Sequence, residues 1–156
     1  ASEAHIDRAV RGAVTQVRKT EADVKVIYIA GPFRATNQAT GKSDAWGVQQ
    51  NVMRAMGLAL EVWKLGHAAM CPHSNTMFFQ DADGCEDRVW LDGNLELLAR
   101  CDAVLLTPDW ARSSGARAEK HFAQERGMPV FQLLGDLKAW LRVQPVEVRS
   151  VDVASV

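Results

Sequence analysis

The sequence predicts an α/β fold in which a parallel sheet of four to five strands is covered by helices on both faces. Short apolar runs alternate with stretches of helical periodicity from about residue 24 to residue 142. Gly or Pro follows several of the apolar runs, as expected where buried strands end. Because strands that alternate with helices need crossover connections, the strands are expected to pair in parallel. The length of 156 residues is that of one ordinary domain, and neither a repeat nor a linker divides it.

The first strand is predicted at 24–30, where the run VKVIYIA stops at Gly31-Pro32. A helix is predicted over 46–65, with Gly66 in the position after its end. A second strand is predicted at 67–71, directly before Pro72. The apolar stripe of the helix consists of Val52, Met56, Ala59, Leu60 and Trp63.

Residues 73–87 are polar with interspersed aromatic side chains, and we expect an irregular loop over one end of the sheet. A helix over 88–100 follows, with leucines on one face. The remaining predicted elements are a strand at 102–107, a helix at 113–126 that ends before Gly127, a strand at 128–134 and a helix at 136–142. Residues 3–20 are predicted to form an additional N-terminal helix, and the tail is either an edge strand or a subunit contact.

The composition excludes several classes of protein. An apolar fraction of 47% and a charged fraction of 24% are those of a folded domain, not of a disordered or fibrous chain. A net charge of -1 argues against a protein that grips nucleic-acid phosphates. No apolar run approaches the roughly 20 residues of a membrane span, and the charged segment 1–23 lacks the apolar centre of a signal peptide. We therefore expect a cytoplasmic protein without nucleic-acid or membrane partners.

The three cysteines do not predict a metal site. Cys71, Cys85 and Cys101 are an odd number without a Cys-x-x-Cys pair, which fits reduced thiols. The spacing of Cys71, His73 and Cys85 matches no zinc pattern, and buried cysteine acting as a small apolar residue is the better interpretation. We therefore expect no metal site at these residues.

In open parallel sheets, ligands bind beyond the carboxyl ends of the strands. This rule selects three segments, 31–41, 71–76 and 108–115. In the last of them, Ser113-Ser114-Gly115 opens a helix, whose free N–H groups either bind an anion or are simply capped by serine. Arg34 would project from the neighbouring strand end, as a counter-charge or as a solvated surface residue.

Two polar residues interrupt apolar helix faces. Glu119 shares a stripe with Ala116 and Ala123, and it is either a buried functional carboxylate or an edge residue that reaches solvent. Asn94 lies among leucines of the helix over 88–100, where an amide that bonds to a neighbouring loop is the simpler interpretation. His73 is interpreted mainly as a structural residue that caps a loop, and orienting a substrate is the alternative.

The five tryptophans are mostly assigned to the core by their spacing. Trp63, Trp90 and Trp140 are predicted to be core residues. Trp110, in the loop after the third strand, is the tryptophan that we expect to line a pocket.

Taken together, these segments resemble the nucleoside 2-deoxyribosyltransferase superfamily. The run YIAGPF at 28–33 resembles its opening motif, and SSGARAE at 113–119 resembles its serine and glycine ahead of a helical glutamate. Asp102 at the start of the third strand and GMPV at 127–130 fit the same pattern. The resemblance covers 24–134, which we take as the family core, followed by a C-terminal helix and tail at 135–156.

The resemblance implies a flavodoxin-like or Rossmann-like domain that cleaves the N-glycosidic bond of nucleosides or nucleotides without metal or cofactor. Glu119 would be the nucleophile at the anomeric carbon, Tyr28 would hydrogen-bond to it, and Asn94 would contact the base. Relatives complete their sites across a subunit interface, which implies a homodimer. The substrate-binding residues implied by position are Gly31, Pro32, Phe33, Arg34, His73, Asp109, Trp110, Ser113, Ser114 and Gly115, with Arg112 beside them.

Two departures from the family pattern refine this prediction. Transferases of free nucleosides have a carboxylate where this chain has Ser113, and a serine at a helix N-terminus favours a phosphate instead. The family also has an aspartate where this chain has Asn94, and an amide cannot deliver a proton to a leaving base. Three explanations remain open, namely that the base needs less protonation, that another group such as His73 helps, or that activity is weak.

We therefore expect hydrolysis of a nucleoside 5′-monophosphate to free base and sugar phosphate. Base exchange by a nucleoside 2-deoxyribosyltransferase is one alternative. The other is a nucleotide-binding module whose catalysis has lapsed through Asn94.

Overall fold

The computed structural model describes residues 24–79 and 82–142. The predicted helix at 3–20 and the tail after 142 lie outside these ranges. Within them, four parallel strands form one sheet in the order β2-β1-β3-β4. They are β1 (Val26–Ala30), β2 (Ala68–Met70), β3 (Ala103–Leu106) and β4 (Val130–Phe131). The predicted α/β fold with a parallel sheet is confirmed, and its topology is flavodoxin-like.

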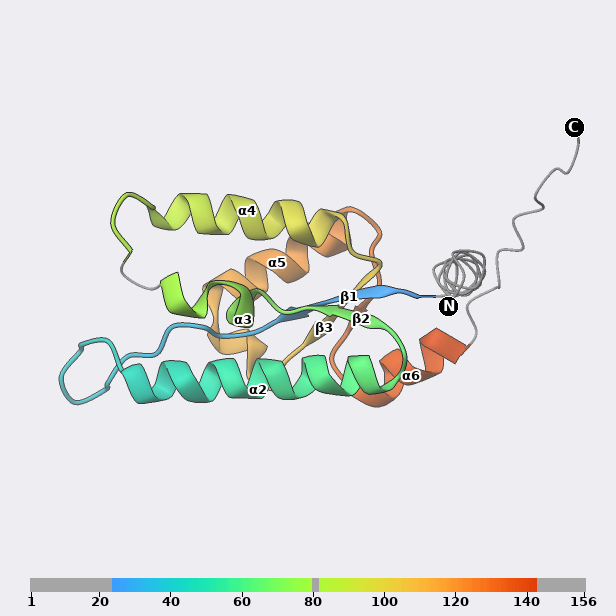
Figure 1. The fold of residues 1–156 in the computed structure, drawn as a ribbon, viewed down its shortest axis with the longest axis horizontal. Helices are drawn as coiled ribbons and strands as arrows, with labels where there is room; N and C mark the ends of the chain where they lie inside the picture. The colour runs from blue at the N-terminus through green and yellow to red at the C-terminus, as the bar shows by residue number, and fades with distance from the viewer. Residues whose placement is uncertain (1–23, 80–81, 143–156) are drawn as a thin grey trace, which may run out of the picture.

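The helices cover both faces of this sheet, as predicted (Figure 1). On one face, α2 (Ala45–Lys64) and α6 (Leu134–Arg142) pack against alternate strand residues such as Ile27 and Leu105. On the other face, α4 (Asp87–Ala99) and α5 (Ser114–Glu125) pack against residues such as Tyr28 and Val104. Two hydrophobic cores therefore lie on either side of strands that are buried on both faces, which is why these strands are continuous apolar runs.

Most predicted elements are observed within one or two residues of their predicted bounds. The helix predicted over 46–65 is α2, and Gly66 follows it with a positive φ of 83°. The fourth strand, predicted at 128–134, contains only two residues in β4. It pairs with β3 alone, at the edge of the described sheet, so few ladder hydrogen bonds extend it.

Two predictions about local structure were wrong. The segment 73–87 is not an irregular loop throughout, because it includes most of the short helix α3 (Pro72–Thr76) and all of the 3₁₀ helix η1 (Met77–Phe79). Pro72 occupies the first helical position of α3. Trp63 is 57% exposed and Leu60 is 54% exposed, because α2 buries smaller side chains against the sheet. The residues that α2 buries are Val48, Val52, Ala55, Ala59 and Val62.

The sequence of strands determines where a ligand can enter. The chain passes from β1 outward to β2, and then returns across β1 to β3 on its other side. Such a reversal of strand order leaves a crevice at the carboxyl ends of the two central strands. The segment after β1 and the 3₁₀ helix η2 (Trp110–Arg112), which follows β3, lie at this end.

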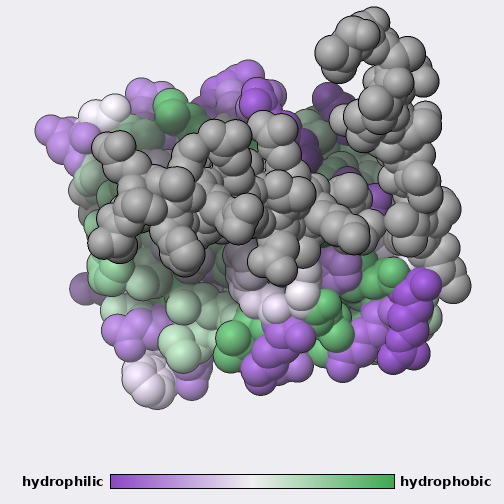
Figure 2. All heavy atoms as spheres, turned by 45° about the vertical axis from the view of Figure 1, so that its right-hand side comes forward, coloured by the Kyte–Doolittle hydropathy of each residue, from purple (hydrophilic) through white to green (hydrophobic). Residues whose placement is uncertain are grey.

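None of the helices in the described part of the chain is both long and apolar enough to cross a bilayer. Outside the grey segments, the face displayed in Figure 2 mixes apolar and polar residues, as the surfaces of globular proteins do.

Candidate active site

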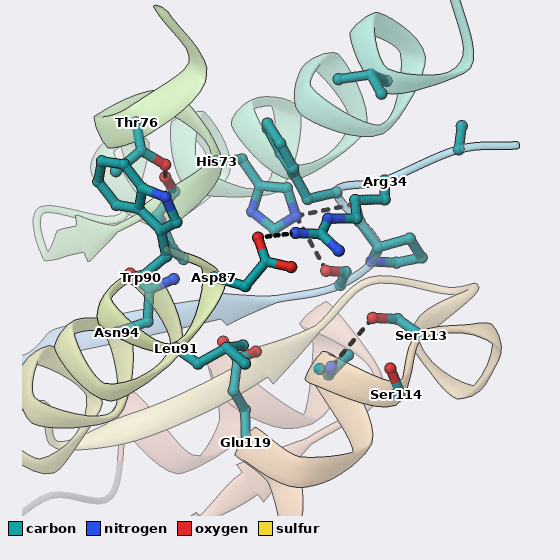
Figure 3. Close-up of a pocket in the computed structure, with 18 of the residues that line it drawn as sticks. Arg34, His73, Thr76, Asp87, Trp90, Leu91, Asn94, Ser113, Ser114 and Glu119 are labelled. Carbon is teal, nitrogen blue, oxygen red and sulfur yellow. Dashed lines mark hydrogen bonds and ion pairs between the residues drawn. The ribbon is translucent and has the colours of Figure 1, made fainter. Parts of the chain in front are cut away.

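A pocket of about 760 Å³ occupies the crevice at the carboxyl ends of β1 and β3. Figure 3 shows that residues of α4 form one side of it and that the start of α5 forms the other. Ten of the predicted site residues line this pocket, so the switch-point rule located it correctly. These residues are Gly31, Pro32, Phe33, Arg34, His73, Asn94, Ser113, Ser114, Gly115 and Glu119.

Glu119 lies on α5 between two fully buried alanines. Ala116 and Ala123, on the same helical stripe, are 1% and 0% exposed, so this face of α5 packs tightly against the sheet. The Glu119 side chain itself keeps partial exposure because it lines the pocket. The carboxylate is therefore neither an edge residue in bulk solvent nor a closed core residue, because its partly exposed side chain lines the pocket.

Tyr28 holds this carboxylate from the sheet. The fully buried Tyr28 hydroxyl donates a hydrogen bond of 2.8 Å to Glu119 Oε1, from a residue 91 positions away in the chain. Burial, and then the neighbouring Glu119 charge, raise the pKa of Tyr28 so far that it remains a donor. Tyr28 does not line the pocket, so it positions Glu119 from the sheet without taking up space in the pocket.

Burial also changes the charge state of Glu119. Loss of hydration raises the pKa of Glu119 to about 7, and the hydrogen bond from Tyr28 partly opposes this rise by stabilising the ionised form. A carboxyl group with such a pKa is ionised in a large fraction of molecules near neutral pH. It can thus act as a nucleophile or a base in this pocket, and it is a candidate functional group on physical grounds.

The start of α5 forms a second wall of the pocket. Ser113 is the N-cap of α5, and its Oγ accepts a hydrogen bond of 3.1 Å from the backbone N–H of Ala116. Ser114 and Gly115 follow in the first turn and also line the pocket, together with Arg112. The wall therefore combines a capped helix N-terminus with an arginine, two features that favour anions.

Arg34 lies at the mouth of the pocket, where the structure shows a partner that the sequence analysis missed. Its guanidinium forms an ion pair with the carboxylate of Asp87, the first residue of α4 (Figure 3). Both side chains are largely exposed, so the pair contributes little to stability. Asp87 lies seven positions before Asn94 on the same side of α4, but this spacing alone does not distinguish it from an ordinary exposed carboxylate.

His73 is buried beneath the segment that follows β1. Its Nε2 lies 3.0 Å from the carbonyl oxygen of Gly31 and 2.9 Å from that of Pro32, so it donates to the backbone. Burial lowers the pKa of the ring, which favours the neutral form. These contacts support the structural role predicted for His73, although the ring also lines the pocket.

Gly31 is required by close packing at the same place. A Cβ built on Gly31 would lie 2.2 Å from Oγ1 of Thr107, which is itself buried at the end of β3. The backbone after β1 can therefore pass against the side chain of Thr107 only because residue 31 has no side chain.

Two predicted substrate-binding residues do not line the pocket. Asp109 accepts a hydrogen bond from Thr107 and forms an ion pair of 2.7 Å with Arg54 of α2. Trp110 packs against the core formed by α4 and α5, and Lys120 lies 4.3 Å from its ring centroid. Their local partners explain both residues without a ligand.

The α4 side of the pocket is more aromatic than the sequence analysis expected. Trp90 was assigned to the core, but it lines the pocket and stacks on Phe79 of η1 with 6.0 Å between ring centroids. Asn94 lies one turn further along α4, and its side-chain amide makes no hydrogen bond within the described ranges 24–79 and 82–142. No periodicity reveals Phe79, because η1 has only three residues.

No cluster of metal ligands exists within the described residues. The part of the chain that the structure describes contains no group of three His, Cys, Asp or Glu side chains able to hold an ion. The three cysteines are free thiols, and only Cys85 lines the pocket. The polar side chains that line the pocket include two carboxylates, an amide, an imidazole, hydroxyls and two guanidinium groups.

Comparison with known proteins places this pocket within a recognised domain. No curated protein and no solved structure matches the chain. One family model matches residues 25–133, which is most of the chain and includes β1, β3 and the pocket between them. The chain therefore belongs to the family described as domain of unknown function DUF7768.

Proposed function

We propose that this protein hydrolyses the N-glycosidic bond of a nucleoside 5′-monophosphate. The observation that carries the proposal is the Glu119–Tyr28 pair, a pocket-lining carboxylate with a raised pKa that is held at 2.8 Å by a buried hydroxyl. The resemblance to the nucleoside 2-deoxyribosyltransferase superfamily, carried by the motifs around Tyr28 and Glu119, supports the same assignment.

The chemistry follows from a carboxylate in a pocket without a metal-ligand cluster among its described residues. Ionised Glu119 attacks the anomeric carbon of the sugar, and the bond to the base breaks with its electron pair going to the base nitrogen. A glycosyl ester of Glu119 results. Water then attacks the same carbon, which releases the sugar phosphate and restores the carboxylate. Tyr28 keeps one carboxylate oxygen fixed, so that the other faces the sugar.

The arrangement of charge supports a phosphorylated sugar. Ser113 and Ser114 at the start of α5 lie beside Arg112, and Arg34 lies across the mouth of the pocket. Together they provide N–H donors, hydroxyls and two guanidinium groups, which suit a phosphate dianion. A free nucleoside has no anionic group for them to bind.

The test is chromatography of free base after incubation with ribo- and deoxyribonucleoside monophosphates and the matching nucleosides. Glu119→Gln is the inactive comparison, and Glu125→Gln, an exposed change on the same helix, is the matched control. Base release from monophosphates that only Glu119→Gln abolishes supports the hydrolase. Release that requires an added acceptor base indicates a transferase. Saturable binding with thermal stabilisation but no turnover indicates a binding module.

We also propose that two copies of the chain associate through α2. Trp46, Met53 and Leu60 recur every seven residues on the side of α2 opposite its buried stripe, and they are 68%, 66% and 54% exposed. Trp63 lies near the other end of the same helix, so an antiparallel pair of α2 helices would bring Trp46 of each copy close to Trp63 of the other. Gly57 lies between Met53 and Leu60 with open space around it, which allows close helix approach.

The measurement for this second proposal is light scattering coupled to size-exclusion chromatography over a range of concentrations. Met53→Glu is expected to yield a monomer, while Gln124→Glu, an exposed change of the same charge on α5, leaves the dimer intact. A wild-type monomer at high concentration would contradict the proposal.

A further inference from the structure

The α4 side of the pocket provides a flat aromatic surface. Trp90 and Phe79 stack with their ring planes 24° apart, and both line the pocket with Leu91. Figure 3 shows Trp90 and Asn94 on the side of the pocket away from Ser113 and Ser114. A phosphate at the start of α5 would therefore leave the base beside this aromatic surface, where a planar ring can stack. The same π-face also attracts a cation.

Asp87 is the only carboxyl group among the described residues that line this end of the pocket, and it forms an ion pair with Arg34 instead of standing free as an acid for a departing base. The amide of Asn94 donates hydrogen bonds but no proton. Nε2–H of His73 is engaged with two backbone carbonyls, and its Nδ1 is buried without a hydrogen-bond partner in the described residues, so the ring has no proton to transfer. A base that is neutral in the nucleotide would have to leave with a negative charge. Lack of a general acid typically costs about 10²–10⁴-fold in rate.

The carboxylate of Asp87 adds a charge argument. Asp87 lines the pocket and is paired with Arg34 when no ligand is bound. A phosphate that recruits Arg34 would take this partner away and leave a carboxylate facing the bound base. A substrate with a negative phosphate and a positive ring would replace both halves of the pair, whereas a neutral base would leave Asp87 without a counter-charge.

We propose that the preferred substrate is a nucleoside 5′-monophosphate whose base carries a fixed positive charge, such as a pyridinium or an N-alkylated purine. This inference rests on the proposed function, because it uses the same nucleophile and phosphate end. When Glu119 attacks the anomeric carbon, the electron pair of the broken bond neutralises the ring, which leaves without a proton. Water then hydrolyses the glycosyl ester, and one proton is released to solvent per turnover.

Paired nucleotides that differ only in this charge test the proposal. Guanosine monophosphate is compared with its N7-methylated form, in ribose and deoxyribose series, and nicotinamide mononucleotide serves as the pyridinium probe. We expect kcat/KM at least about 100-fold higher for the charged member of a pair. A pH indicator should report one proton per released base. Rates with Glu119→Gln are subtracted to remove spontaneous cleavage.

Two variants of α4 sharpen the test. Asp87→Asn is expected to lower the preference for the charged member by about tenfold, since an attractive charge is removed. Asp92→Asn is the matched control, because Asp92 lies on the same helix and forms an exposed ion pair with Arg88. Asn94→Asp should restore an acid and raise turnover of the neutral nucleotide. Equal effects of Asp87→Asn and Asp92→Asn would overturn the role of Asp87.

The outcomes also separate this inference from the proposed function. Cleavage of neutral nucleotides as fast as charged ones, abolished by Glu119→Gln, would overturn the substrate class and leave the hydrolase intact. Loss of neutral-base cleavage in Asp81→Asn would show that a residue outside the described ranges supplies the proton, which also overturns the inference. Absence of Glu119-dependent cleavage of any probe would overturn both.

Discussion

The helices α5 and α4 form opposing walls of one pocket, but they present their carboxylates in opposite settings. Glu119 of α5 lies between buried alanines, receives a hydrogen bond from the sheet residue Tyr28 and has a pKa raised to about 7. Asp87 of α4 is largely exposed and paired with the equally exposed Arg34. One carboxylate is fixed by the core, and the other is held only by a surface ion pair.

This difference suggests a division of roles. A group that must attack a single atom needs a fixed position and an adjusted pKa, and only the packed wall of α5 provides both. A group that selects a substrate by charge can remain at the mouth of the pocket and exchange partners. The position of each carboxylate relative to the sheet therefore indicates which kind of role it can have.

The largest expected effect comes from the fixed carboxylate. Glu119→Gln keeps the size of the side chain but removes the charge that attacks the sugar, so kcat should fall by on the order of 10⁴-fold. Steady-state release of free base from the preferred nucleotide is the measurement. A variant that retains more than a tenth of the activity would show that Glu119 is not the nucleophile.

The same substitution should stabilise the fold at neutral pH. The pKa of Glu119 is raised to about 7 in the folded protein, so between its ordinary value and 7 the folded state holds a proton that the unfolded state has lost. Stability therefore falls as the pH rises through this window. The glutamine of Glu119→Gln does not titrate, so this variant does not lose stability as the pH rises. Its free energy of unfolding in urea should exceed that of wild type by up to about 3 kcal/mol at pH 8.

The control for this stability prediction is the pH dependence itself. Below about pH 4 Glu119 is mostly protonated in both states, so the difference between wild type and Glu119→Gln should nearly vanish there. Glu125→Gln, on the exposed side of α5, should show no such growth with pH. A difference that stays constant between pH 5 and pH 8 would contradict the burial of Glu119.

A change at the start of α5 tests whether this wall of the pocket binds the phosphate. Ser113→Asp retains an N-cap oxygen for the N–H of Ala116, so α5 should remain intact. Its charge would repel a phosphate, and monophosphate affinity should fall roughly 10–100-fold while nucleoside affinity stays within about twofold. Both affinities are measured by isothermal titration calorimetry in the Glu119→Gln background, because this substitution prevents turnover. An equal loss for both ligands would indicate a distorted site instead.

Much of the fold could be predicted because the buried strands are continuous apolar runs. The runs around Tyr28 and Val104 gave the central strands, and Gly66 marked the end of α2 correctly. The errors arose where periodicity carries no information. The helix α3 has five residues and η1 has three, too short for a stripe. On α2, Val52, Met56 and Ala59 were placed correctly, but Leu60 and Trp63 were wrongly assigned to the buried side. Large residues were favoured there, whereas close packing on the sheet selected smaller ones.

The site could be predicted in part for a related reason. Glu119 and Asn94 are polar residues on apolar stripes, and Ser113 opens a helix, so each breaks a local pattern. Asp87 breaks none, because a carboxylate in the first turn of an exposed helix is ordinary. Its importance depends on Arg34, 53 positions away, and only the folded chain brings the two together.

The smallest expected effect concerns the link between the sheet and α5. Tyr28→Phe removes one hydroxyl from a fully buried ring, so the core keeps its packing while Glu119 loses its donor. Because that hydrogen bond favours the ionised carboxylate, its loss should raise the pKa of Glu119 further above 7. In wild type, kcat/KM should rise with pH to a plateau with a midpoint near 7, and Tyr28→Phe should move that midpoint upward and lower the plateau about tenfold. Initial rates from pH 5 to pH 9 measure both quantities. A lower plateau with an unmoved midpoint would mean that Tyr28 acts only through packing, and that its hydrogen bond does not set the pKa of Glu119.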